Sequence, residues 1–70
     1  MNKFAERLIE LRVQGGLSQR DLSKEIFIAQ PTIANWEAGR REPSFNKLIK
    51  IAEYFDVTTD YLLGRAGHDI

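Results

Sequence analysis

The sequence predicts an all-α fold of five short helices. Apolar residues recur at intervals of three and four, as on one face of a helix, and glycine, proline and capping residues separate five such segments. In addition, the run from Leu17 to Ser44 holds two short amphipathic patterns joined by only a few residues. A tight helix pair with a polar outer face is a common means of placing one helix in the major groove of DNA.

The first two helices are marked by clear end signals. The first is predicted from about Lys3 to Gln14, and Gly15 and Gly16 end it, because glycine readily adopts the left-handed conformation that follows a helix. Ser18 opens the second helix, and Asp21 three residues later gives a capping-box-like pattern near the positive end of the helix dipole. The residues expected to face inward are Phe4, Leu8, Leu11, Leu22 and Ile26.

The third and fourth helices flank a short loop. The third spans roughly Gln30 to Glu37, with Pro31 in its first turn, where a missing amide proton costs little, and Gly39 closes it. Pro43 and Ser44 introduce the fourth helix. The residues expected to face inward are Ile33, Trp36, Leu48, Ile51, Ala52 and Phe55.

A last short helix completes the predicted domain. Thr58 is its expected N-cap. Its apolar residues are Tyr61, Leu62 and Leu63. We expect one domain over residues 1–64 and a flexible tail over residues 65–70.

Size and composition exclude several classes of protein. Seventy residues leave no room for a deep catalytic cavity beside a hydrophobic core. The absence of cysteine removes disulfides and zinc–thiolate sites and fits a reducing cytoplasm. The apolar stretches are too short to span a membrane, and the first residues lack the apolar core of a signal peptide. We therefore expect a cytoplasmic protein that does not associate with membranes.

The net charge does not favour nucleic-acid binding by itself, because ten basic residues balance ten acidic ones. The distribution is uneven, however, and phosphates respond to the local field. Residues 38–50 contain four basic side chains against Glu42 alone, whereas residues 51–70 contain four acidic side chains against Arg65. The positive segment adjoins the third predicted helix.

Several short motifs stand together at spacings that are typical of one family. They are Leu11-Arg12, Leu17-Ser18-Gln19, Gln30 with Thr32-Ile33, Trp36-Glu37-Ala38-Gly39-Arg40, Pro43-Ser44, and Val57 through Gly64. With these motifs the chain resembles, from about Phe4 to Gly64, the lambda-repressor-like helix-turn-helix domains of the Cro and phage-repressor family. The resemblance implies a transcriptional regulator of phage or mobile-element type that binds a double-stranded DNA operator.

The resemblance also implies base-reading positions on the third helix. Gln30 matches a position where a glutamine amide pairs with adenine N6 and N7. Pro31 has no donor and offers only apolar contact, for example to a thymine methyl group. Thr32 and Asn35 complete the exposed face, with Asn35 the better base reader.

Phosphate-binding and structural roles are implied in the same way. Gln19 matches a position at the start of the second helix that binds a backbone phosphate, and Arg40 and Arg41 match a phosphate-binding loop. Arg12 and Glu37 match a partly buried ion pair that ties the first helix to the end of the third.

Departures from the family pattern keep a second hypothesis open. Phe27 occupies a turn position where glycine is common, so we expect the turn to be remodelled. Ala29 replaces the usual Ser or Thr cap, which costs about 1 kcal/mol. Together with the neutral net charge and Pro31, these departures leave open, as the alternative to DNA binding, a protein-interaction module of antirepressor or antitoxin type that contacts a partner protein through Phe27 and Ile28.

The remaining chemistry argues against an enzyme. His68 is the only histidine and lies in the predicted tail, where it cannot orient a nucleophile or a metal. We therefore expect no catalytic residue, cofactor, metal or small-molecule substrate. A single module reads only a few base pairs, so a homodimer on two half-sites is expected, with Tyr61 and Ile70 as its candidate surface. Two alternatives stay open for the chain: a complete Cro-like protein, or the DNA-binding part of a longer repressor.

Overall fold

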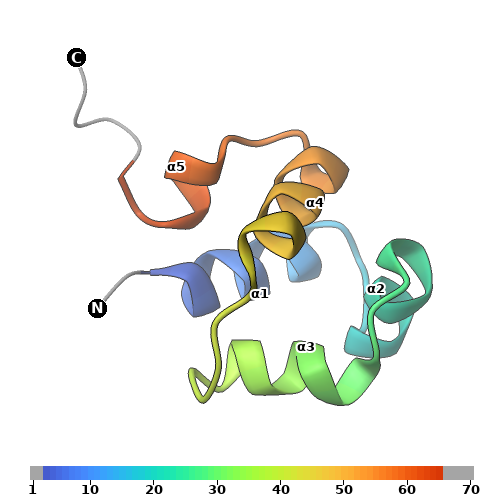
Figure 1. Ribbon diagram of the computed structural model, residues 1–70. Coiled ribbons are helices and arrows are strands. Elements are labelled where there is room, and N and C mark those ends of the chain that lie inside the picture. The colour runs from blue at the N-terminus through green and yellow to red at the C-terminus, as the bar shows by residue number, and fades with distance from the viewer. Residues whose placement is uncertain (1–2, 66–70) are drawn as a thin grey trace.

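The computed structural model describes residues 3–65 of the chain. Within this range the elements are α1 (Phe4–Gln14), α2 (Gln19–Ile26), α3 (Gln30–Glu37), α4 (Phe45–Phe55) and α5 (Thr59–Leu62). Helix α3 lies along the lower edge of the domain in Figure 1, packed against α1 and α2, while α5 lies on the opposite side against α1 and α4. The predicted all-α class is confirmed, and none of the described helices is long and apolar enough to cross a membrane.

Every helix contributes to one core. A leucine or isoleucine with no exposed surface comes from each of the five helices, namely Leu8, Leu22, Ile33, Ile51 and Leu62. Phe4 and Trp36 add an edge-to-face aromatic pair, with ring centroids 6.1 Å apart, that joins α1 to α3. The predicted inward faces are thus confirmed, although Leu11, Phe55 and Leu63 are only partly buried. This core holds α3 in place by its inner face and leaves its outer face open.

The predicted capping box of α2 is present. The Ser18 hydroxyl accepts the Asp21 backbone N–H at 3.0 Å, and the Asp21 carboxylate accepts the Ser18 backbone N–H at 3.0 Å. The hydrogen bond from the Ser18 backbone N–H to the Asp21 carboxylate, and after it the interaction of that carboxylate with the Ser18 side chain, lower the pKa of Asp21 below its ordinary value. The helix that leads into the α2–α3 turn is therefore fixed at its start by a charged side chain.

We expect this carboxylate to make stability depend on pH. A carboxyl whose pKa is lowered by folding stabilises the folded state above its unfolded pKa, here the ordinary 3.8, and that contribution is lost as pH falls through the lower folded value. Thermal melting of the wild type and Asp21→Asn should thus differ at neutral pH and converge in strong acid. Asparagine keeps an acceptor oxygen but does not titrate. A difference in melting temperature that stays constant with pH would contradict the assignment.

The α2–α3 turn corrects two expectations. The turn is not remodelled to spare Phe27 the left-handed conformation. Phe27 adopts that conformation itself, with φ 59° and ψ 43°. The Ser23 carbonyl accepts the backbone N–H groups of both Phe27 and Ile28, and the Ser23 hydroxyl donates to the Ile28 carbonyl. This backbone direction leaves Phe27 86% exposed and turns Ile28 into the core at 7% exposure. The prediction that Ile28 is an exposed partner contact is therefore wrong.

The other helix ends follow the predicted signals. Ala29 provides no side-chain cap to α3, as expected, whereas Ser44 caps α4 by accepting the Lys47 backbone N–H at 3.3 Å. Thr58 caps α5 by accepting the Tyr61 backbone N–H at 2.9 Å. Because these caps are local, the sequence alone was sufficient to locate them.

The candidate dimer surface is only partly described. Tyr61 is half-buried, and the Arg7 guanidinium of α1 lies 4.4 Å from the centre of its ring. Residues 66–70 of the predicted tail, which include His68 and Ile70, lie outside the described residues.

Candidate nucleic-acid interface

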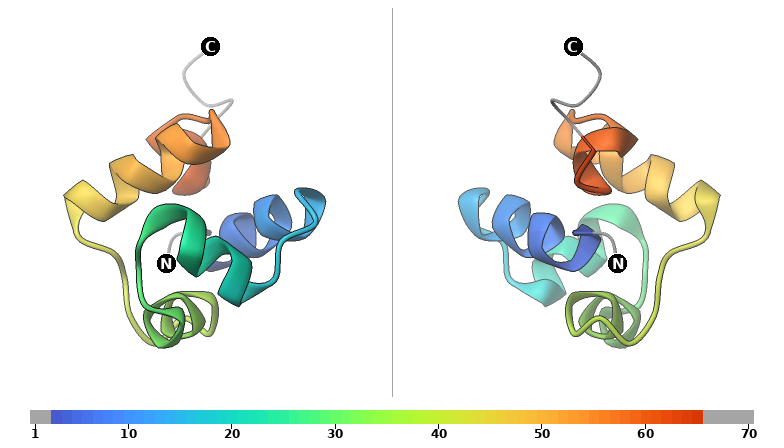
Figure 2. Two further views of the ribbon diagram at one scale, coloured as in Figure 1. Left: turned by 90° about the vertical axis from the view of Figure 1, so that its right-hand side faces the viewer. Right: turned by 90° about the vertical axis from the view of Figure 1, so that its left-hand side faces the viewer.

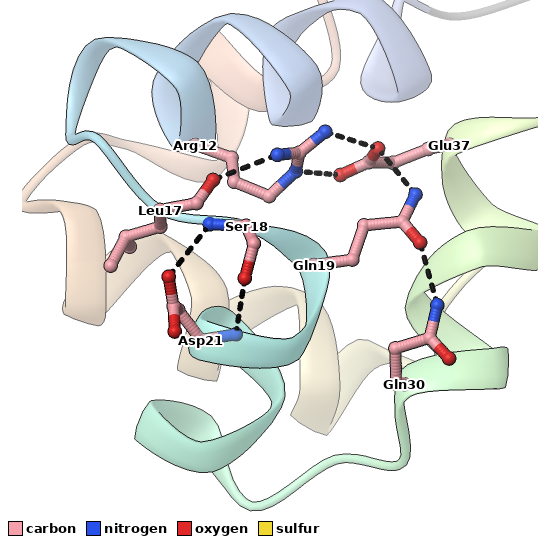
Figure 3. Close-up of polar contacts among 7 residues, drawn as sticks. All are labelled: Arg12, Leu17, Ser18, Gln19, Asp21, Gln30 and Glu37. Carbon is pink, nitrogen blue, oxygen red and sulfur yellow. Dashed lines mark hydrogen bonds and ion pairs between the residues drawn. The ribbon is translucent and has the colours of Figure 1, made fainter.

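A chain of polar contacts joins α1, α2 and α3 (Figure 3). Arg12 donates from Nε to Glu37 Oε2 at 2.7 Å and from Nη2 to Glu37 Oε1 at 2.9 Å. Gln19 donates from Nε2 to Glu37 Oε1 at 2.9 Å and accepts at Oε1 from Gln30 Nε2 at 2.7 Å. Gln19, at the start of α2, is thus hydrogen-bonded to both ends of α3, to Gln30 at its first residue and to Glu37 at its last.

The Arg12–Glu37 pair expected from the resemblance is present and well shielded. The Arg12 side chain is 15% exposed and the Glu37 side chain 6%. The hydrogen bond to Glu37 raises the pKa of Arg12 above its ordinary value, against the opposing effect of desolvation. Arg12 also donates from Nη1 to the Leu17 carbonyl at 2.8 Å, which ties the α1–α2 turn to the same guanidinium. The two-point geometry is the strong form of an arginine–carboxylate pair.

Gln30 is oriented by Gln19 in a way that suits base reading. A glutamine amide has two N–H donors and one carbonyl acceptor. One donor of Gln30 is used for Gln19, so one donor and the carbonyl oxygen remain for a ligand. This remaining pair matches adenine, which offers an acceptor at N7 and a donor at N6 in the major groove. The contact between the two glutamines was not predicted from the sequence.

The other predicted readers lie along the same helix. Pro31 is exposed, while Thr32 and Asn35 are half-buried. Asn35 Oδ1 accepts a hydrogen bond from Arg40 Nη1 at 3.0 Å. The structure therefore links a predicted base reader directly to a predicted phosphate-binding residue. The second lone pair of Asn35 Oδ1 and the two N–H donors of its amide remain for other partners.

A groove of about 310 Å³ separates α3 from the loop that follows it and from the start of α4. Thr32 and Asn35 line one side, and Arg41 and Lys47 contribute cationic side chains to its lining. Lys47 was not predicted as a site residue. The local excess of basic residues between positions 38 and 50 was the signal that pointed to it.

Comparison with known proteins decides the family. The sequence profile of the helix-turn-helix family matches residues 8–62. This chain belongs to the helix-turn-helix family. The resemblance predicted from the short motifs is confirmed.

Individual members of the helix-turn-helix family align closely with it. The transcriptional regulator AnsR of Bacillus subtilis is 42% identical over 60 residues, which cover 86% of this chain and 52% of AnsR. The restriction-modification controller protein C.AhdI of Aeromonas hydrophila is 33% identical, with a TM-score of 0.77 over 86% of this chain and 91% of its own. The P22 c2 repressor, solved with a synthetic operator, is 25% identical, with a TM-score of 0.83 over 93% of this chain and 98% of its own.

The chain spans only part of most relatives. It covers 52% of the length of YqaE and 49% of ImmR, both helix-turn-helix regulators of Bacillus subtilis, and 30% of the activator BcrR of Enterococcus faecalis. What these relatives share with this chain is therefore the helix-turn-helix domain.

Within this helix-turn-helix, the predicted site residues fall into two groups. Helices α2 and α3 carry the polar readers, and the buried pair joins Arg12 of α1 to Glu37 of α3. The loop after α3 brings Arg40 and Arg41 beside them, both exposed. Tyr61 lies in α5, on the far side of the domain from α3 in both views of Figure 2. Phe27 lies in the turn between the two helices and is exposed, with Lys50 Nζ 5.7 Å from its ring centre.

Proposed function

We propose that this chain is the DNA-binding domain of a transcriptional regulator that reads an operator through the major groove with α3. The observation that carries the proposal is Gln30, which Gln19 holds with one donor and one acceptor left for a base. Support comes from relatives that are named as helix-turn-helix transcriptional regulators and from the likeness to the P22 c2 repressor, which was solved with an operator.

In this proposal the side chains divide the work. Gln30 and Asn35 read bases, with Thr32 beside them and Pro31 in apolar contact. Gln19, Arg40 and Arg41 bind phosphates and set the register of α3 in the groove. The hydrogen-bonded side chains of Arg12, Glu37 and Gln19 have a positioning role, because they fix the helix that carries Gln30.

The proposal further assigns two copies to one operator. One helix-turn-helix module contacts only a few base pairs, so two half-sites about one helical turn apart supply the specificity. Since the relatives named above are bacterial, the DNA that such a regulator binds lies in the cytoplasm. No catalytic role and no cofactor form part of the proposal.

Gln30→Ala tests the readout. The preferred site is first selected from a random pool of duplexes, and binding to that site and to unrelated DNA is then titrated at one salt concentration. We expect Gln30→Ala to cost roughly 1–3 kcal/mol on the selected site and little on unrelated DNA. Gln14→Ala, which removes an exposed glutamine from the end of α1, is the matched control and should leave both affinities unchanged. Equal losses on the two DNAs would refute base reading by Gln30.

One observation favours a second function, the protein-interaction module. Phe27 is 86% exposed in a left-handed conformation, a costly way to place an aromatic ring in solvent. The surface is smaller than predicted, because Ile28 is buried. A complex with a partner protein that is insensitive to salt and lost in Phe27→Ala would favour this function, whereas steep salt dependence favours DNA.

A further inference from the structure

Ser23 of α2 holds the turn that leads into α3. Its hydroxyl donates to the Ile28 carbonyl at 2.5 Å, and its own carbonyl accepts the Ile28 backbone N–H at 3.3 Å. The same carbonyl accepts the backbone N–H of Phe27. A serine inside a helix often donates back to a carbonyl of the preceding turn, whereas Ser23 donates forward, five residues along the chain. Ile28 is therefore held by one residue at both its N–H and its carbonyl group.

The stretch that Ser23 holds has weak local preferences of its own. Phe27 is in the left-handed conformation, which is unfavourable for any residue with a Cβ atom. Ala29, the N-cap of α3, makes no side-chain hydrogen bond to that helix, and Pro31 brings no backbone N–H to its first turn. By contrast, the Ser18 side chain fixes the start of α2. The Ser23 hydroxyl restrains a stretch that lacks such a cap.

The Ile28 carbonyl lies two residues before Gln30, the first residue of α3. It belongs to the planar peptide group that joins Ile28 to Ala29, so a hydrogen bond to it fixes the orientation of that group. The next carbonyl, that of Ala29, begins α3 by accepting the backbone N–H groups of Thr32 at 3.0 Å and Ile33 at 3.3 Å. The restraint therefore acts on the backbone that carries Gln30.

We propose that Ser23 is a positioning residue for base reading by Gln30. Gln19 and Ser23 are four positions apart in α2, so their side chains lie on one face of that helix. Gln19 accepts a hydrogen bond from the Gln30 side chain at 2.7 Å, and Ser23 holds the backbone just before Gln30. The inference rests on the proposed function, since it needs Gln30 to meet a base. The restraint of α3 by Ser23 can be measured without DNA.

The first test is amide hydrogen exchange of the free protein, which reports local opening of backbone hydrogen bonds. Ser23→Ala should raise the exchange rates of the Thr32 and Ile33 N–H groups by about fivefold, as expected for the loss of one hydrogen bond. The Leu48 N–H, bonded at the start of α4, should keep its rate. Ser23→Thr retains a hydroxyl and should resemble the wild type. Unchanged rates at Thr32 and Ile33, or an equal rise over the whole domain, would overturn the inference.

The second test compares the duplexes that each variant selects from a random pool. Ser23→Ala should lose base preference at the position where Gln30→Ala loses it, and the ratio of affinities for selected and unrelated DNA should fall about fivefold or more. In a Gln30→Ala background, Ser23→Ala should not lower this ratio further, because both changes act on one contact. Preference at the other base pairs should remain, since Asn35 is bonded to Arg40 and not to Ser23.

Thr58→Ala is the matched control for a loss of stability alone. It also removes one hydroxyl hydrogen bond, the one that caps α5 through the Tyr61 N–H at 2.9 Å, on the side of the domain opposite α3 (Figure 1). It should lower the melting temperature and leave base preference unchanged. The inference is overturned if both variants change base preference alike, or if Ser23→Ala weakens all positions equally or none. If the wild type selects no sequence while Ser23→Ala still speeds exchange at the start of α3, the restraint stands and the proposed function is refuted.

Discussion

Glu37→Ala is expected to lower the free energy of unfolding by about 3 kcal/mol, because removal of one member of a buried ion pair leaves the other charge poorly solvated. The Arg12 guanidinium, only 15% exposed, would keep just the Leu17 carbonyl as a partner. Gln19 would also lose its acceptor. For a domain of this size the melting temperature should fall by roughly 12 °C or more. Thermal and urea unfolding measure both quantities.

An exposed ion pair of the same chain provides the control. Lys3 and Glu6 approach to 3.9 Å, but their side chains are 60% and 71% exposed. Glu6→Ala should therefore change stability by about 0.5 kcal/mol or less. In a background of Arg12→Ala, the loss caused by Glu37→Ala should shrink, since the stranded charge is gone. Equal effects of Glu37→Ala and Glu6→Ala would show that burial does not govern the pair.

The helices could be predicted from the sequence because their signals are local. Ser18, Ser44 and Thr58 cap the helices that they were expected to cap, and the apolar spacing located the buried faces. The α2–α3 turn was not predictable in the same way. Phe27 and Ile28 are adjacent and both apolar, and the left-handed conformation of Phe27 alone decides which of them enters the core. Residue pattern carries no information on that choice.

The sequence predicted which positions carry the site residues, but it did not predict which of these side chains contact one another. The resemblance placed Gln19 and Gln30 on their helices, yet their mutual hydrogen bond depends on how α2 packs against α3. The contact between Arg40 and Asn35 likewise depends on the path of the chain after α3. The prediction of Tyr61 as a dimer surface stays a prediction, and the structure adds that the Arg7 guanidinium lies over its ring.

Removal of both loop arginines should weaken DNA binding without changing which sequence is preferred. Each cation that neutralises a phosphate adds about 0.9 to the slope of log affinity against log salt, so Arg40→Ala with Arg41→Ala should lower the slope by about 1.8 and the affinity by roughly 60-fold at 0.1 M salt. The loss should be similar on the selected operator and on unrelated duplexes. Gln30→Ala, by contrast, should act on the operator alone.

The control for this double variant removes two cations elsewhere. Lys3 and Arg7 lie at the start of α1, where the Arg7 guanidinium covers the ring of Tyr61 in α5. Lys3→Ala with Arg7→Ala makes the same change in net charge, so it separates a phosphate contact from a general field effect. If the two double variants reduce the salt slope equally, the loop does not contact DNA directly. If neither reduces it and Phe27→Ala instead abolishes a protein complex, the exposed turn is the functional surface.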